Sequence, residues 1–226
     1  MSVARVVAPW LCVAGLWCAA GAAFASSAAP VQAVALPGGV RAEVHAGAPP
    51  ELRLQGRDGA VLQRWPLAAA DGRLAGGAVQ WLHWPARQAL VVVPGDLPEL
   101  WDISLDPHAE DRYDGLVHDY RFGEGVPVRG FLHRRRIALP GPVRAWAADE
   151  AGALLAVVIA AATPGQAPQV QAWSLDARRV ARRWAWPDGL RHEAQPRFDP
   201  AGDALWLVEP AEGGQRRRLP LAHTAE

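Results

Sequence analysis

The chain has 226 residues, with 23 acidic and 23 basic residues, and all of the basic residues are arginine. A neutral chain has no general electrostatic attraction to nucleic acid or to anionic membranes, so we expect neither as a partner. Both cysteines, Cys12 and Cys18, lie near the N-terminus, which leaves the rest of the chain without a disulfide, a thiolate metal site or a covalent c-type haem attachment.

Residues 1–25 have the pattern of a secretory signal peptide. Arg5 is the only charge before an apolar run that reaches Phe24, and the run ends in a small-x-small cleavage pattern. An uncleaved anchor is the alternative, because the run approaches the roughly 20 apolar residues that span a bilayer. Pro9 and the small residues near the end of the run favour cleavage. We therefore expect a periplasmic protein with a leader at 26–37 and one domain at 38–226.

An internal repeat runs through this domain. Residues 85–93 (PARQALVVV), 149–157 (DEAGALLAV) and 200–208 (PAGDALWLV) each read as a turn followed by an apolar strand, and they align Leu90, Leu154 and Leu205. Two further pairs of segments alternate apolar and polar residues, which is typical of half-buried strands. These pairs are 101–106 with 171–176, and 61–65 with 180–184.

In chain order the repeat contains four strands, as does the blade of a β-propeller. Three such units and a partial one at 40–67 predict an all-β fold: a small or partial β-propeller of about four blades built from four-stranded antiparallel sheets. An open ring would expose strand edges. We therefore expect closure by a strand at 31–36 that pairs with 219–221, or by a homodimer that completes the ring. A β-sandwich of similar hairpins is the alternative.

Aromatic and arginine residues recur along the predicted blades. We expect the tryptophans to pack between neighbouring sheets, with a platform for stacking sugar rings as the alternative. We expect the basic runs at 133–136 and 216–218 to be solvated surface. The nine tryptophans of the domain are Trp65, Trp81, Trp84, Trp101, Trp146, Trp173, Trp184, Trp186 and Trp206.

A segment of different composition interrupts the repeat at 106–136 (DPHAEDRYDGLVHDYRFGEGVPVRGFLHRRR). A loop of this length in a compact domain usually has a function. We expect this insertion to be the recognition surface of a non-catalytic binding or assembly protein, whose partner is a periplasmic protein or a small anionic ligand. Ser104 and Ser174, the two serines that follow the leader, occupy equivalent repeat positions, and no nucleophile elbow or H-E-x-x-H motif is present.

The insertion also carries a family resemblance. Residues 113–121 (YDGLVHDYR), together with 99–103 (ELWDI), 123–125 (GEG) and 130–132 (GFL), are similar to segments of exported bacterial propellers of the cytochrome d1-domain-like and YVTN-repeat family. That resemblance implies a propeller of seven or eight blades, for which this chain is too short. It also implies a haem-handling or redox-associated role in which His118 is an axial ligand.

The residues of the matched segment allow a ligand site. An imidazole can ligate a metal while a neighbouring carboxylate orients its other nitrogen, and a guanidinium can pair with a carboxylate of an anionic ligand. The same side chains could instead tie the insertion to its blade, and a lone histidine lacks the clustered partners of a convincing metal site. No cofactor is required, and haem is implied by resemblance only. The candidate ligand-binding residues are Asp114, His118, Asp119, Tyr120 and Arg121.

One catalytic alternative remains from the same segment. Asp114, paired with Glu110 or Glu124, could serve a carboxylate-dependent hydrolase, since two carboxyl groups at a suitable separation can act as acid and base.

Overall fold

The computed structural model describes residues 30–114, 126–161, 163, 165–211 and 213–221, and only the backbone of 112–114, 126 and 127. The signal peptide predicted at 1–25 lies outside the described residues. The described part consists of β-strands, loops and two short 3-10 turns, η1 (Pro37–Gly39) and η2 (Pro85–Arg87). It holds no helix of the length and hydropathy that a bilayer span requires.

Four antiparallel sheets follow one another along the chain, and we call them blades 1 to 4. Blade 1 contains β1 (Gln32–Ala35), β2 (Arg41–His45), β3 (Glu51–Gln55) and β4 (Val61–Pro66). Blade 2 contains β5 (Gln80–Trp84), β6 (Ala89–Val93), β7 (Glu99–Ser104) and β10 (Arg134–Ala138). Blade 3 contains β11 (Val143–Ala148), β12 (Leu155–Ile159), β13 (Gln169–Ser174) and β14 (Arg179–Ala185). Blade 4 contains β15 (Gln195–Phe198), β16 (Ala204–Val208) and β17 (Arg216–Pro220).

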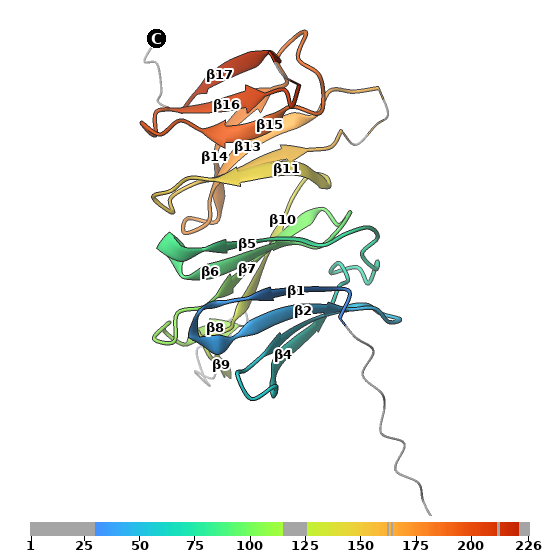
Figure 1. Ribbon diagram of the computed structural model, residues 1–226, viewed down its shortest axis with the longest axis vertical. Helices are drawn as coiled ribbons and strands as arrows, with labels where there is room; N and C mark the ends of the chain where they lie inside the picture. The colour runs from blue at the N-terminus through green and yellow to red at the C-terminus, as the bar shows by residue number, and fades with distance from the viewer. Residues whose placement is uncertain (1–29, 115–125, 162, 164, 212, 222–226) are drawn as a thin grey trace, which may run out of the picture.

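The blades stack face to face along the long axis of the molecule, with blade 1 at one end and blade 4 at the other (Figure 1). Alternation along β6 explains the stacking: Leu90 and Val92 pack towards blade 1, whereas Val91 and Val93 pack towards blade 3. Because both faces of such a strand are covered, its sequence is a continuous apolar run. In the described residues the four sheets thus form an open stack, and the two-sheet sandwich is excluded.

Tryptophan side chains fill the spaces between the blades, as predicted, with one exception. Eight of the nine belong to, or pack against, the three apolar clusters that join blade 1 to 2, blade 2 to 3 and blade 3 to 4. Trp101 is the largest fully buried side chain and lies between blades 1 and 2. Trp206 lies outside these clusters, on the side of blade 4 that faces away from blade 3.

The prediction of an all-β partial propeller of about four blades is confirmed, but its closure is not. The unit expected to be partial, at 40–67, is complete because β1 supplies its fourth strand, and the three-stranded blade is the last one. The predicted pairing of 31–36 with 219–221 is wrong, since β1 pairs with β2 through the tight turn of η1. A short hairpin closes a small loop at much lower entropic cost than pairing across the whole domain.

The repeat alignment contains a slip of one residue in its second unit. Asp149 pairs with Leu154, and Asp199 with Ala204, through bonds from the aspartate N–H to the partner's carbonyl of 3.0 and 2.9 Å. Leu155, rather than Leu154, is therefore the counterpart of Leu205, and it packs towards the preceding blade as Leu205 does. Two adjacent leucines fit the same pattern, so only the hairpin pairing distinguishes them.

The end of the insertion also differs from the prediction. β10 begins at Arg134 and forms the outer strand of blade 2, so the insertion ends at 133 rather than 136. The expectation that 133–136 is a solvated patch is wrong, because Arg135 and Arg136 pair with the buried carboxylates of Asp102 and Glu99. The run at 216–218 is exposed, as predicted.

Candidate functional site

The insertion leaves blade 2 after β7 and returns into β10 of the same blade. Its two arms pair as β8 (Arg112–Asp114) and β9 (Val126–Val128), beside blade 1 in Figure 1. Where the arms meet the blade, a Cβ on Gly130 would overlap the carbonyl oxygens of Ala109 and Glu110. The Gly130 N–H donates to Asp111 Oδ1 at 3.1 Å. Glycine thus allows the two arms to approach closely and fixes the base of the insertion.

A polar hollow of about 300 Å³ lies beneath this base, between blades 2 and 3. We call it the insertion pocket, because it is walled on one side by the insertion and on the other by the two blades. It is lined by Arg87, Ala89, Asp102, Ser104, Asp106, Ala109, Glu110, Gly130, His133, Arg135 and Asp176.

Asp102 forms the floor of the insertion pocket. It stands in the middle of β7, directly opposite Arg135 on β10, and the Arg135 guanidinium donates to its carboxylate. Arg87 approaches the same carboxylate, with Nη2 3.6 Å from Oδ2. Only 3 % of the Asp102 side chain is exposed. A carboxylate so buried is tolerated because two cations offset the loss of its hydration.

Arg87 connects the two blades that flank the pocket. It projects from η2 in blade 2, and its Nη1 donates to Asp176 Oδ1 at 2.8 Å and to the Gly152 carbonyl at 3.3 Å, both in blade 3. Its guanidinium also lies over the Trp84 ring, 5.5 Å from the centroid. These contacts hold the walls of the pocket in register through the terminal nitrogens of Arg87, whereas its buried Nε has no hydrogen-bond partner within the described residues.

Two other carboxylates of the pocket, those of Asp106 and Glu110, have fewer partners than that of Asp102. Asp106 Oδ1 accepts the His108 N–H at 2.8 Å, which shapes the turn into the insertion. Glu110 is exposed and forms no ion pair with any residue in the described ranges. The described residues contain no group of three or more His, Cys, Asp or Glu that could hold a metal ion. The pocket mouth therefore favours cationic or hydrogen-bond-donating groups on a partner.

The return strand β10 anchors the insertion by its arginines. Arg136 binds Glu99 with two hydrogen bonds, Nε to Oε2 at 3.0 Å and Nη2 to Oε1 at 2.7 Å, and Glu99 also accepts Trp101 Nε1–H at 3.1 Å. The Arg134 guanidinium lies 4.5 Å from the Trp101 centroid and 5.3 Å from that of Trp65. Burial, assisted by the neighbouring charge of Arg136, lowers the pKa of Arg134 to about 10, so it remains cationic at neutral pH.

Most of the predicted ligand-binding residues lie outside the described residues. Asp114 belongs to β8, where its backbone pairs with Val126, but its side chain is not described. His118, Asp119, Tyr120 and Arg121 fall in 115–125, as does Glu124 of the catalytic alternative, and their roles remain predictions.

The structure adds residues that sequence reasoning missed, chiefly Arg87, Asp102 and Asp176. One signal for Asp102 was present, since it interrupts an otherwise apolar strand (LWDIS). Arg87 and Asp176 gave no such signal, because they are 89 positions apart and meet only when blades 2 and 3 stack.

Comparison with known proteins supports the fold and goes no further. No family model matches the chain, and no curated protein does. Among solved structures it is similar to dihydro-heme d1 dehydrogenase NirN in complex with DHE, with a TM-score of 0.50 and 17% identity over 80% of this chain and 34% of that one. It is also similar to Kluyveromyces lactis Hsv2, with a TM-score of 0.38 and 14% identity over 85% and 62% of the two chains.

A third similar structure is the acylaminoacyl peptidase of Pyrococcus horikoshii, with a TM-score of 0.44 and 8% identity over 80% of this chain and 30% of that one. The chain thus spans about a third of NirN and less than two thirds of the others. At 17% identity the likeness to NirN shows a propeller-like fold alone, because one fold hosts many functions.

Proposed function

We propose that the protein is a non-catalytic binding or assembly protein of the periplasm, and that it recognises a partner protein through its insertion. The observation that supports this proposal is the insertion pocket, whose walls are locked by Arg87 and Arg135 while Glu110 at its mouth has no cationic partner among the described residues. Periplasmic location rests on the signal peptide predicted at 1–25.

The charges of the pocket favour a partner with basic side chains over a small anion. Both guanidinium groups that line it already pair with the carboxylates of Asp102 and Asp176, which offset their positive charge. The carboxylates of Asp106 and Glu110 line the same pocket, and neither forms an ion pair within the described residues. Complementary charge at such a rim chiefly increases the rate and specificity of association.

The chemistry of the lining residues supports a binding role over a catalytic one. Ser104 Oγ accepts the Asp106 N–H at 3.3 Å, which places the hydroxyl in a turn of the backbone. The carboxylate of Asp102 pairs with two guanidinium groups and is only 3 % exposed, so a substrate has little access to it.

A charge reversal in the full chain tests this proposal. The tagged protein is cross-linked in periplasmic extract of its native host, and the captured partner is compared between the wild type and Glu110→Arg. We expect Glu110→Arg to reduce the recovery of the partner at least about tenfold, since a repulsive charge replaces an attractive one. Glu150→Arg, which reverses an exposed glutamate in the turn before β12, is the matched control and should retain the partner. Equal recovery with both variants would reject the insertion pocket as the recognition surface.

The haem-handling alternative does not fit the described residues of this pocket. Its lining is charged or polar, with Ala89 and Ala109 as the apolar side chains, whereas a tetrapyrrole requires a broad apolar slot. His118 lies outside the described residues. An absorbance spectrum of protein purified from the native host separates the two candidates: a Soret band that His118→Ala abolishes would favour haem, and a colourless protein removes this alternative.

A further inference from the structure

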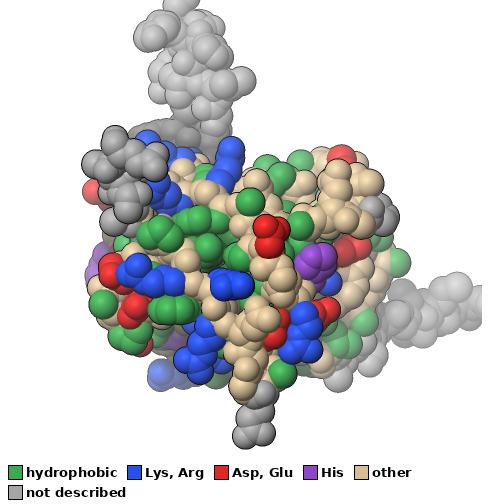
Figure 2. Space-filling model, turned by 90° about the horizontal axis from the view of Figure 1, so that it is seen from above, with side chains coloured by type: hydrophobic (Ala, Val, Ile, Leu, Met, Phe, Trp, Pro, Cys, Tyr) green, Lys and Arg blue, Asp and Glu red, His purple; other side chains and the backbone are tan. Residues whose placement is uncertain are grey.

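The outward face of blade 4 carries an unusual set of side chains. In the register of this sheet Arg197 on β15 lies directly opposite Trp206 on β16, and Val208 is flanked by Gln195 and Arg216. Leu205 and Leu207 alternate with these residues and pack towards blade 3, so Trp206 and Val208 point away from it. Figure 2 views the molecule from this end, where arginine side chains lie among hydrophobic, uncharged and acidic ones.

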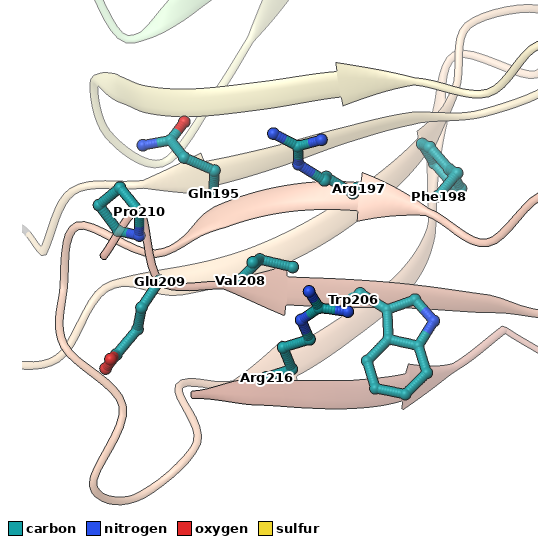
Figure 3. Close-up of a pocket in the computed structure, with 8 residues that line it drawn as sticks. All are labelled: Gln195, Arg197, Phe198, Trp206, Val208, Glu209, Pro210 and Arg216. Carbon is teal, nitrogen blue, oxygen red and sulfur yellow. The ribbon is translucent and has the colours of Figure 1, made fainter. Parts of the chain in front are cut away.

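This face contains the largest of the hollows that we describe, with a volume of about 600 Å³. Its walls are formed by Gln195, Arg197, Phe198, Trp206, Val208, Glu209, Pro210 and Arg216. Figure 3 shows that the Glu209 carboxylate points away from the guanidinium groups of Arg197 and Arg216. We call this hollow the blade 4 pocket.

The two cations of the blade 4 pocket have no acidic partner within the described part of the chain. Two nearby acids are occupied by other arginines: Glu209 Oε2 lies 3.2 Å from Arg191 Nη2, and Asp203 Oδ2 lies 2.7 Å from Arg218 Nη2. The third, Asp199, accepts hydrogen bonds from the Ala201 N–H and the Trp206 indole. The backbone N–H of Arg191 and its side chain also lower the pKa of Glu209, so that this pairing persists at neutral pH. Arg197 and Arg216 thus present unneutralised charge beside an aromatic ring.

A further blade is a poor occupant of this face. Ala156 and Val158, the residues of blade 3 that correspond to Trp206 and Val208, are small enough for the next sheet to pack closely. A sheet at that distance from blade 4 would bury two unpaired guanidinium groups, which is costly. On the outward face of blade 1 of a second copy, Arg41 and Arg53 already pair with Glu43 and Glu51, and Arg64 lies beside them, so head-to-tail pairing would bring no unpaired carboxylate to Arg197 and Arg216.

We propose that the blade 4 pocket binds a small aromatic carboxylate. The ring of the ligand lies on Trp206 and Val208, and its carboxylate pairs with Arg197 and Arg216, which a planar guanidinium can do with two hydrogen bonds. A hollow of about 600 Å³ has the size of a small-molecule site. Trp206 Nε1 donates to Asp199 Oδ2 at 3.3 Å, which fixes the indole before the ligand arrives. This site is independent of the insertion pocket.

Calorimetric titration of the full chain with 2-naphthoate tests the site, and 2-naphthylmethanol, which has the same rings without the charge, is the control ligand. We expect 2-naphthoate to bind at least about tenfold more tightly than the alcohol, because charge-assisted hydrogen bonds to arginine are the strong ones. No binding of 2-naphthoate, or equal binding of the two compounds, would overturn the proposal.

Three variants locate the binding on this face. Arg197→Gln and Arg216→Gln should each weaken 2-naphthoate about tenfold, whereas Arg217→Gln should leave it unchanged. Arg217 is adjacent to Arg216 but lies opposite Leu207, on the other side of the sheet. Equal effects of all three substitutions would indicate non-specific charge and reject the site. Sedimentation velocity supplies a second readout: a dimer that Trp206→Arg dissociates would show that another copy occupies this face instead.

Discussion

Arg87 in blade 2 and Asp176 in blade 3 form an ion pair between adjacent blades, with Nη1 2.8 Å from Oδ1. The same guanidinium approaches Asp102 from its other side, at 3.6 Å. The two carboxylates differ sharply in environment, since 76 % of the Asp176 side chain is exposed but only 3 % of that of Asp102. Water therefore screens the pair of Arg87 with Asp176 but hardly reaches the pair of Arg87 with Asp102. We expect removal of the Asp102 carboxylate to cost more stability than removal of the Asp176 carboxylate.

Neutralising Asp102 should destabilise the fold strongly. Asp102→Asn leaves Arg87 and Arg135, which are 9 % and 17 % exposed, without the carboxylate that they share. We expect the free energy of unfolding to fall by roughly 3 kcal/mol, as when one partner of a buried ion pair is removed. Urea denaturation followed by tryptophan fluorescence measures it. Asp176→Asn is the control and should cost less than about 1 kcal/mol; equal losses would contradict the assignment of Asp102 as the buried centre.

Adding a methyl group at Gly130 should disturb the base of the insertion. A Cβ there overlaps the backbone carbonyls of Ala109 and Glu110, which cannot move without shifting the insertion arms. We expect Gly130→Ala to lower the free energy of unfolding by more than about 1 kcal/mol, a loss typical of steric strain in a well-packed backbone. Thermal unfolding detects the change, and an unaltered melting temperature would mean that the two arms are not held together as described.

The tryptophans between blades should matter more than the one outside them. Trp101 is fully buried between blades 1 and 2, whereas Trp206 lies half-buried on the open face of blade 4. Trp101→Ala should cost about 3–5 kcal/mol of unfolding free energy, in the range of large-to-small core substitutions. Trp206→Ala should cost clearly less, because it leaves no enclosed cavity. Chemical denaturation of both variants decides the matter, and a reversed order would refute the stacked-blade packing.

Asp199 should report on the position of the Trp206 indole. The backbone N–H of Ala201 and then the indole N–H lower the pKa of Asp199 below its ordinary value of 3.8. Carboxyl ¹³C NMR titration of Trp206→Phe should show this pKa rising, but not fully to 3.8, because the Ala201 hydrogen bond remains. An unchanged pKa would mean that the indole does not donate to this carboxylate.

The same shift predicts a pH dependence of stability. Because the folded pKa of Asp199 lies below the unfolded one, its contribution is fully present above about pH 4 and is lost as the pH falls through the folded value. Asp199→Asn should therefore lose less stability than the wild type on acidification below pH 4. Thermal melts between pH 2 and 5 test this prediction, and parallel curves for the two proteins would disprove it.

Local patterns in the chain carried most of the fold prediction. Turns followed by apolar runs, and runs that alternate with a period of two, depend on neighbouring residues only, so the strands of blades 2 to 4 could be predicted. The same locality caused the slip at Leu154, where either of two adjacent leucines completes the pattern. For the same reason the sequence could not decide which blade β1 belongs to. The alternation of apolar and polar residues at 32–35 fits an outer strand of blade 1 and of blade 4 equally well.

Part of the candidate site could also be predicted from local sequence patterns, and part could not. The composition of 106–136 marked an insertion, although its last three residues belong to β10, and Asp102 interrupts an apolar strand. No sequence pattern predicted that Arg87 would contact Asp102 and Asp176, because these three side chains come from two different sheets. The unpaired state of Arg197 and Arg216 was equally hidden, since it depends on which acids other arginines occupy.

From its residues alone, this protein was determined to be an all-β chain of repeated four-stranded units with a single polar insertion. Backbone propensity and apolar periodicity depend on a few neighbouring residues, so both can be recognised in the sequence alone. The stacking of the blades alone decided which charged groups meet, which are neutralised and which face of blade 4 stays open. Those outcomes depend on distances of a few ångströms between residues far apart in the chain, and Coulomb and desolvation energies are set by such distances and by burial.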